Sequence, residues 1–248
     1  MITLLLVGIG TGNPDHLTGE AARALNTAGL ILVPRKGEEK SDLAHLRHRI
    51  LAQVLTRAVP VAGYDVPVRA GGPDYLGAVH DWHDAIAAVW QATIAAHLPQ
   101  GGTVALMVWG DPSLYDSTLR IAARLPDLTV RVVPGITSLQ VLTAAHAIPL
   151  NTLAEPVTIT TGRRLREEGW PQGALSVAVM LDPGGAFGVL NPKGISIWWG
   201  AYVGMAEQVL IHGPLAEVGG EILATRARLR AAHGWIMDIY LLRRGHDG

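Results

Sequence analysis

The sequence contains no cysteine, and only one of its 248 residues is phenylalanine. Without cysteine the chain has no disulfide, no thiolate nucleophile and no cysteine-ligated zinc or iron–sulfur site. A formal net charge of −1 provides no basic field that would attract nucleic acid or an acidic membrane surface. No apolar run approaches the ~20 residues that a membrane-spanning helix needs. We therefore expect neither nucleic acid nor a membrane as a partner.

The rest of the composition is typical of a folded globular protein. Hydrophobic residues make up 49% of the chain and charged residues 17%, which argues against disorder. This length is enough for one large domain or two smaller ones. The first apolar segment has no basic residues before it, so we expect no secretion signal and predict a cytoplasmic enzyme.

The stretch at residues 104–117 is the most informative part of the chain. Its apolar run ends abruptly at Gly110-Asp111-Pro112. A short apolar run bounded by turn residues is typical of a strand buried on both faces, as in a parallel sheet. Gly110 allows the backbone to approach a ligand, and Pro112 prevents the strand from continuing. Because open α/β sheets bind ligands at the carboxyl ends of their strands, we predict a ligand pocket at this turn.

The first half of the chain alternates apolar runs with helical patterns. Strands are expected at residues 3–10, 30–33, 104–109 and 128–133, and helices at residues 19–28, 42–55, 78–98 and 117–125. Thr18 is positioned to cap the first helix. Residues 59–68 contain two prolines, which favour an edge strand. This alternation predicts an α/β domain with a mainly parallel sheet.

The second half is richer in strands, several of which adjoin directly. Strands are expected at residues 156–161, 176–181, 195–199, 208–212 and 235–242, with helical stretches at 139–147 and 163–168. This pattern predicts a second, mixed and partly antiparallel sheet. We place the domain boundary near residues 114–117, which gives domains at 1–115 and 116–248 that both contribute to one cleft.

The opening Gly8-Ile9-Gly10 does not complete a dinucleotide-binding fingerprint. That motif would need a glycine at position 13, where Asn13 stands, and Pro14 is unsuited to the start of a phosphate-binding helix. The second predicted strand ends in Pro34-Arg35 and not in the acidic residue that would bind a ribose. A dehydrogenase is therefore disfavoured.

Several basic residues are candidates for contact with an anionic substrate. Arg35 and Lys36 follow the second strand, although the charged run they begin is also typical of a solvated loop, and Arg47 and Arg49 are weaker candidates. His80 and His83 share one helix face, which would suit a metal ion, but no third ligand stands at a suitable spacing. An exposed or hydrogen-bonded pair is favoured, or a substrate contact, and no metal is expected.

Four turns occur in a set order: residues 8–15, Gly110-Asp111-Pro112, residues 133–138 and Met180, followed by residues 208–215. Together they resemble the tetrapyrrole (corrin and porphyrin) methylases over nearly the whole chain. The resemblance implies a two-domain α/β methylase, usually a homodimer, that holds S-adenosylmethionine in the cleft between its domains and uses no metal. Details at residues 33–35, 75–83 and 109–117 are similar to a member that methylates an anionic precorrin and releases its acetyl group.

The resemblance also implies roles for particular residues. Trp109, Gly110 and Asp111 would hold the methionine end of the cofactor, with Leu114 beside it. Further cofactor contacts are implied at Thr137, Ser138, Met180, Gly204 and Met205. From the residues alone, Met180 is equally a core residue, and Thr137 and Ser138 are equally a helix cap.

Release of an acetyl group requires a general base, and the sequence offers several. The candidates are Asp15, His16, His80 and His83, and we choose Asp15 because it follows the first strand. The family's opening turn usually reads Gly-x-Gly-Pro-Gly-Asp, whereas Thr11 and Asn13 replace its proline and aspartate here.

The alternatives are a methylase of the same fold with another precorrin position or a protein as substrate, and a binding module without activity. A protein substrate would remove the need for a basic surface, and a binding module would bind ligand without methyl transfer.

Overall fold

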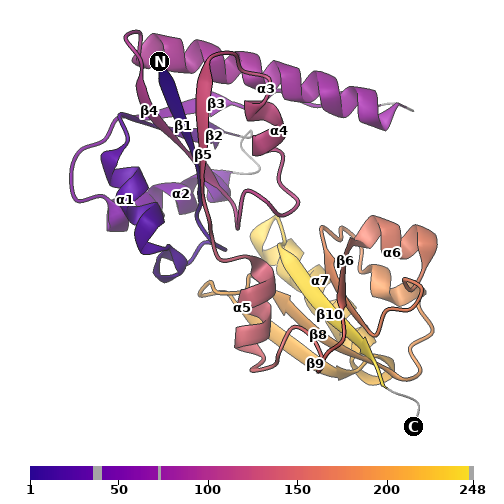
Figure 1. The fold of residues 1–248 in the computed structure, drawn as a ribbon. Coiled ribbons are helices and arrows are strands. Elements are labelled where there is room, and N and C mark those ends of the chain that lie inside the picture. Colours follow the sequence, from indigo (N-terminus) through magenta and orange to yellow (C-terminus); the bar gives the residue numbers. More distant parts are fainter. Residues whose placement is uncertain (36–40, 72–73, 246–248) are drawn as a thin grey trace. The chain divides into compact units, whose positions relative to one another are not determined.

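The computed structural model describes residues 1–35, 41–71 and 74–245, and the chain forms two compact units, Met1–Thr137 and Ser138–Gly248. Each unit is built on its own five-stranded sheet (Figure 1). The division falls later in the chain than the predicted boundary at residues 115 and 116. The reason is β5 (Leu128–Val133), which pairs with β1 (Ile2–Gly8) from Ile2↔Leu128 to Val7↔Val133 and so belongs to the first unit.

The sheet of the first unit is parallel throughout, which confirms the predicted sheet type. Its strand order is β3-β2-β4-β1-β5, where β2 is Leu30–Arg35, β3 is Val61–Asp65 and β4 is Gly102–Val108. The proline-flanked β3 is an edge strand, as predicted. Because all five strands run the same way, their carboxyl ends meet at one edge of the sheet.

Helices cover both faces of this sheet and account for its two hydrophobic clusters. One cluster packs α3 (Tyr75–His97) and α4 (Thr118–Ala122) on the sheet, with Trp90 and Ile121 buried. The other packs α1 (Gly19–Thr27) and α2 (Ser41–Val54) on the opposite face, with Leu25 and Ile50 buried. A short 3-10 turn, η1 (Pro14–His16), precedes α1, and the Thr18 side chain caps α1 by accepting the Ala21 N–H at 3.0 Å.

The sheet of the second unit is mixed, which also confirms the prediction. Its strands are β6 (Val157–Thr161), β7 (Ser176–Met180), β8 (Ile195–Ala201), β9 (Val209–Pro214) and β10 (Asp238–Arg244), in the order β6-β7-β10-β8-β9. β10 is antiparallel to both β7 and β8. β7 and β8 therefore run in the same direction, and their carboxyl ends lie at the same edge.

The helices of the second unit are α5 (Ser138–Ala145), α6 (Gly162–Glu168), η3 (Ala186–Val189) and α7 (Leu215–His233). The sequence did not predict α7. Gly219 and Gly220 adjoin in its middle, and glycine is a poor helix former. The helix is stabilised by packing, because Leu215, Ile222 and Leu229 are buried on one side of it. Among the described residues, no helix is long and apolar enough to cross a membrane.

Candidate functional site

Three backbone turns meet at the carboxyl edge of the first sheet, and two glycines, Gly8 and Gly135, allow this contact. A Cβ on Gly135 would lie 2.1 Å from the carbonyl oxygen of Gly110 and 2.8 Å from Cα of Gly8. A Cβ on Gly8 would lie 2.6 Å from the backbone nitrogen of Gly135. The backbone at the carboxyl ends of β1, β4 and β5 is therefore packed more closely than a side chain at Gly8 or Gly135 would permit.

The side of Gly110 on which a Cβ would stand is open. Its backbone N–H donates to the carbonyl oxygen of Gly10 at 2.8 Å, which links the turns after β1 and β4. Gly110 has a φ of 65°, and no described atom lies within 4 Å of the position that a Cβ would occupy. Only glycine adopts this backbone conformation readily and leaves the space beside it empty. The turn is thus a cradle that a side chain would fill.

Asp111 holds the turns after β4 and β5 together. Its carboxylate accepts hydrogen bonds from the N–H of Gly135 at 2.8 Å, from the N–H of Ser113 at 2.8 Å and from the Ser113 hydroxyl. Burial would raise the pKa of Asp111, but these hydrogen bonds outweigh it and leave the pKa below its ordinary value. Asp111 is therefore an ionised acceptor that positions the backbone next to Gly110 through its hydrogen bonds to Ser113 and Gly135.

The other predicted cofactor residues of the first unit lie in the same turns. Trp109 precedes Gly110, and the guanidinium carbon of Arg47 lies 5.2 Å from the centre of its ring. The N–H of Leu114 donates to the carbonyl oxygen of Asp111 at 3.3 Å, within the same turn. Thr137 ends the first unit two residues after Gly135, and Ser138 begins α5 in the second unit.

The remaining predicted cofactor residues gather at one edge of the second sheet. Met180 is the last residue of β7, and Gly204 and Met205 stand in the turn after β8. The Gly204 N–H donates to Oε1 of Gln208 at 2.8 Å. The turn after Met180 is held by the buried Asp182, whose carboxylate accepts from the Tyr240 hydroxyl at 2.7 Å and the Gly184 N–H at 3.0 Å.

The predicted base and the predicted basic residues occupy different environments. Asp15 is exposed in η1, with its N–H donating to Oδ1 of Asn13 at 2.9 Å. Arg35 forms an ion pair with Asp65 of the neighbouring strand at 3.0 Å, and both side chains are largely exposed. Lys36 lies outside the described residues.

His83 is buried, whereas a residue that contacts a large substrate has to be accessible. It is 3% exposed, and within the described residues its Nε2 has no hydrogen-bond partner. Burial, followed by the positive charge of Arg124, lowers the pKa of His83. Nδ1 of the neighbouring His80 lies 3.0 Å from Nη2 of the same Arg124. Across the described part of the chain, no three His, Cys, Asp or Glu side chains are grouped as metal ligands.

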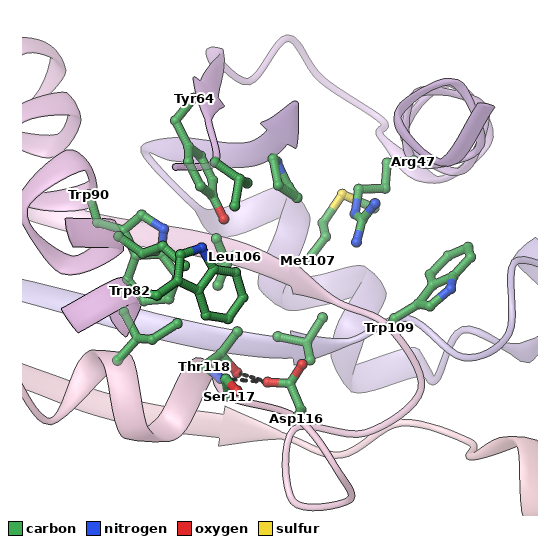
Figure 2. Close-up of a pocket in the computed structure, with 15 residues that line it drawn as sticks. Arg47, Tyr64, Trp82, Trp90, Leu106, Met107, Trp109, Asp116, Ser117 and Thr118 are labelled. Carbon is green, nitrogen blue, oxygen red and sulfur yellow. Dashed lines mark hydrogen bonds between the residues drawn. The ribbon is translucent and has the colours of Figure 1, made fainter. Parts of the chain in front are cut away.

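A cavity of about 230 Å³ lies within the first unit at the carboxyl ends of β2 and β4. The sequence predicted a ligand pocket at the turn after β4, but not the walls that Tyr64, Trp82 and Trp90 provide. Figure 2 shows aromatic walls from Trp82, Trp90 and Trp109, with Tyr64, Arg47 and Asp116 approaching from different sides. Trp82, Ile86 and Trp90 recur at the helical spacing that is typical of a core-facing stripe. One part of that stripe lines the cavity instead.

The polar groups of this cavity interact electrostatically. Burial raises the pKa of Tyr64 to about 12. Burial also lowers the pKa of Arg47, although the nearby Tyr64 and Asp116 act in the opposite direction. The Oδ1 atom of Asp116 accepts from the N–H of Thr118 at 2.6 Å and from the Thr118 hydroxyl. A cation, a carboxylate and a protonated phenol are thus combined in one largely apolar cavity.

Comparison with known proteins agrees with the fold and with the arrangement of turns. The family described as Tetrapyrrole (Corrin/Porphyrin) Methylases matches residues 3–219. A Sinorhizobium protein named precorrin-6A synthase [deacetylating] is 47% identical over 254 aligned residues, which cover 100% of this chain and 97% of that protein. This chain therefore belongs to the tetrapyrrole methylase family.

Solved structures show the same architecture. A cobalamin-synthesis-related protein (CobF) from Corynebacterium diphtheriae has a TM-score of 0.85 and 38% identity, covering 98% of this chain and 99% of its own. A uroporphyrin-III C-methyltransferase from Thermus thermophilus, complexed with S-adenosylhomocysteine, has a TM-score of 0.60 at 18% identity, covering 97% of this chain and 92% of its own. The predicted two-sheet methylase fold is confirmed, and this chain is a methyltransferase.

Proposed function

We propose that this chain is an S-adenosylmethionine-dependent C-methyltransferase of cobalamin biosynthesis. It methylates precorrin-5 at ring carbon 1 and releases the acetyl group as acetate, which gives precorrin-6A. The observation that carries this proposal is the 47% identity, over 100% of this chain and 97% of the relative, to the protein named for that reaction. The relation to CobF over 98% of this chain supports the same pathway.

The residues at the edge of the first sheet fit the proposed cofactor. The open face at Gly110 leaves room for a ligand against the backbone, and the preceding Trp109 is half-buried with its ring by Arg47. We propose that Trp109, Gly110, Asp111, Leu114, Thr137 and Ser138 bind the methionine end of S-adenosylmethionine. Met180, Gly204 and Met205 would bind its adenine side. When bound, this cofactor supplies a methyl group as an electrophile.

The chain itself has to position the reactants and exclude water. Methyl transfer needs in-line alignment more than it needs acid or base groups, so a turn stiffened by Asp111 suits it. The proposed substrate carries several carboxylates, which guanidinium groups bind well. Arg35 and Lys36 are proposed for this contact, and the Arg35 side chain would have to leave Asp65 to make it. His83 stays a predicted substrate residue that must first become accessible.

We further propose that the protein acts as a homodimer in the cytoplasm and that no metal ion takes part. The family resemblance supports both the dimer and a reaction without a metal ion. Sedimentation velocity at several protein concentrations measures the oligomeric state. A single monomeric species at all concentrations would contradict the dimer.

The test begins with isothermal titration of the purified protein with S-adenosylhomocysteine. The protein is then incubated with precorrin-5 and a methyl-labelled donor, and the product is analysed by mass spectrometry. We expect binding, a gain of one methyl group and a loss of one acetyl group. Binding without turnover would move the substrate to another precorrin or to a protein. Failure to bind would remove the assignment of the cofactor residues.

A further inference from the structure

The cavity of the first unit is too small for a whole tetrapyrrole but large enough for one of its substituents. Its volume of about 230 Å³ is below the ~300–1,000 Å³ that is usual for pockets that enclose drug-sized ligands. It is lined at the carboxyl ends of two strands, by Pro34 at the end of β2 and Trp109 just after β4. A group attached to a ligand at this edge of the sheet can therefore enter it.

Asp116 is held so that one of its oxygens remains available. Both hydrogen bonds to its carboxylate, from the N–H and the hydroxyl of Thr118, are accepted by Oδ1. Within the described residues, Oδ2 accepts none, and Figure 2 shows the carboxylate rising from the floor of the cavity. The preceding Tyr115 has a φ of 49°, an uncommon conformation for a residue other than glycine. Backbone strain of this kind is often retained at functional sites.

The phenol of Tyr64 faces the same space from β3. Its side chain is buried, and a phenol is protonated near neutral pH even at its ordinary pKa, which burial raises further. The hydroxyl is therefore available as a donor. Figure 2 shows the hydroxyl directed from the strand toward the middle of the cavity. Arg47 lies at another side, between Met107 and Trp109.

We propose that this cavity receives the acetyl group of the substrate, and that Asp116 is the general base for its removal. The Tyr64 hydroxyl donates to the acetyl oxygen. This inference rests on the proposed function and names the base that the reaction needs. Sequence reasoning missed Asp116 because it follows the conspicuous Gly110-Asp111-Pro112 turn and looks like an ordinary turn residue.

The step is balanced with water as its only further reactant. Water attacks the acetyl carbonyl carbon and forms a new C–O bond, while its proton passes to Oδ2 of Asp116. The negative charge that develops on the acetyl oxygen is stabilised by the Tyr64 hydroxyl. The C–C bond to the ring then breaks, and its electron pair stays on ring carbon 1, the atom that the proposed reaction methylates. Acetic acid leaves near the guanidinium of Arg47 and gives its remaining proton to solvent, which yields acetate.

A neutral acetyl group fits this cavity better than a carboxylate side chain does. The charges of Arg47 and Asp116 already oppose each other there, so a second carboxylate would add an uncompensated negative charge in surroundings of low dielectric constant. The indole rings of Trp82 and Trp90 offer apolar surface to a methyl group. The exposed Asp15 has neither an apolar wall nor a neighbouring phenol in the cavity, so Asp116 replaces it as the preferred base.

The test compares Asp116→Asn with Asp81→Asn. The asparagine in the first variant retains an oxygen that accepts from Thr118, whereas its amide cannot take up a proton. We expect acetate release to fall by about 10²–10⁴-fold, as is typical on loss of a general base, with unchanged affinity for S-adenosylhomocysteine. Asp81, exposed on α3, serves as the matched control, and its variant retains the rate of the unmodified protein. Retention of that rate by Asp116→Asn would overturn the proposal.

A second variant and an isotope label test the proposal independently of Asp116→Asn. We expect Tyr64→Phe to slow acetate release by about 10²–10³-fold, as is usual for loss of an oxyanion donor. In ¹⁸O-enriched water each acetate should carry one ¹⁸O atom, and unlabelled acetate would overturn the proposed attack by water. If the unmodified protein releases no acetate from precorrin-5, the proposed function fails and takes this inference with it. If the unmodified protein releases acetate and both variants release it at the same rate, the role of the cavity is overturned, whereas the proposed function stands.

Discussion

The carboxylate of Asp111 accepts the backbone N–H of Gly135 at 2.8 Å and so joins the turn after β4 to the turn after β5. The same carboxylate accepts the N–H of Ser113 at 2.8 Å. These bonds hold the turn that follows Gly110 against Gly135, while the face of Gly110 stays open. Asp111 is therefore expected to act on ligand binding through the backbone that it positions.

Replacement of Asp111 by alanine tests this role. The change leaves two backbone N–H groups without their acceptor at a site that is only 9% exposed. We expect the free energy of unfolding to fall by about 1–3 kcal/mol and the affinity for S-adenosylhomocysteine to fall with it. Urea denaturation and titration calorimetry measure the two effects. Asp81→Ala, at an exposed position, should change neither. Unchanged stability of the Asp111 variant would contradict the role of the hydrogen bonds.

The lowered pKa of Asp111 predicts how stability depends on pH. Burial raises this pKa, but the hydrogen bonds from Ser113 and Gly135 outweigh burial and leave it below the ordinary value of 3.8. A depressed folded-state pKa contributes stability above the ordinary pKa, and this contribution is lost as the pH falls through the folded value. The stability advantage of the protein over Asp111→Asn should therefore shrink between about pH 5 and pH 2. Urea denaturation across this range measures it, and a constant difference would contradict the assignment.

Gly110→Val, compared with a control, distinguishes the effect of filling the space beside the turn from the effect of backbone strain. With a φ of 65° and no described atom within 4 Å of its Cβ position, the new side chain would enter the open cradle. Gly234→Val is the matched control, because Gly234 has a φ of 72° and equally open surroundings at the end of α7. Both variants should lose about 1–2 kcal/mol of stability through left-handed strain. Only the Gly110 variant should lose binding of S-adenosylhomocysteine, and equal binding by the two would contradict the cradle.

Much of the fold was predictable because its signals are local. The apolar runs and the glycine and proline turns predicted the strands of both sheets. The position of Thr18 before the first helix predicted that its side chain caps α1. The unit boundary was not predictable from these signals. The return of β5 to the first sheet beside β1 is a long-range pairing, with no local mark in the sequence.

The candidate site divides in the same way. The glycine turn was visible because Gly110, Asp111 and Pro112 are adjacent in the sequence. The full lining of the cavity was not visible, because Tyr64, Trp82 and Asp116 come from three separate parts of the chain that only the fold brings together. The burial of His83 was also hidden, because its helical spacing is the same whether the face meets solvent or another helix.

The helix that the sequence missed, α7, provides the final prediction. Gly220 is exposed in its middle, with no described atom close to its Cβ position beyond the helix itself. Gly220→Ala should therefore stabilise the protein by about 1 kcal/mol, since alanine restricts the unfolded chain and favours the helix. Differential scanning calorimetry should show a rise of about 2–4 °C in Tm. Gly234→Ala at the end of the same helix should lower Tm, because its φ of 72° strains any residue with a Cβ. A lower Tm for Gly220→Ala would mean that α7 needs both glycines for its packing.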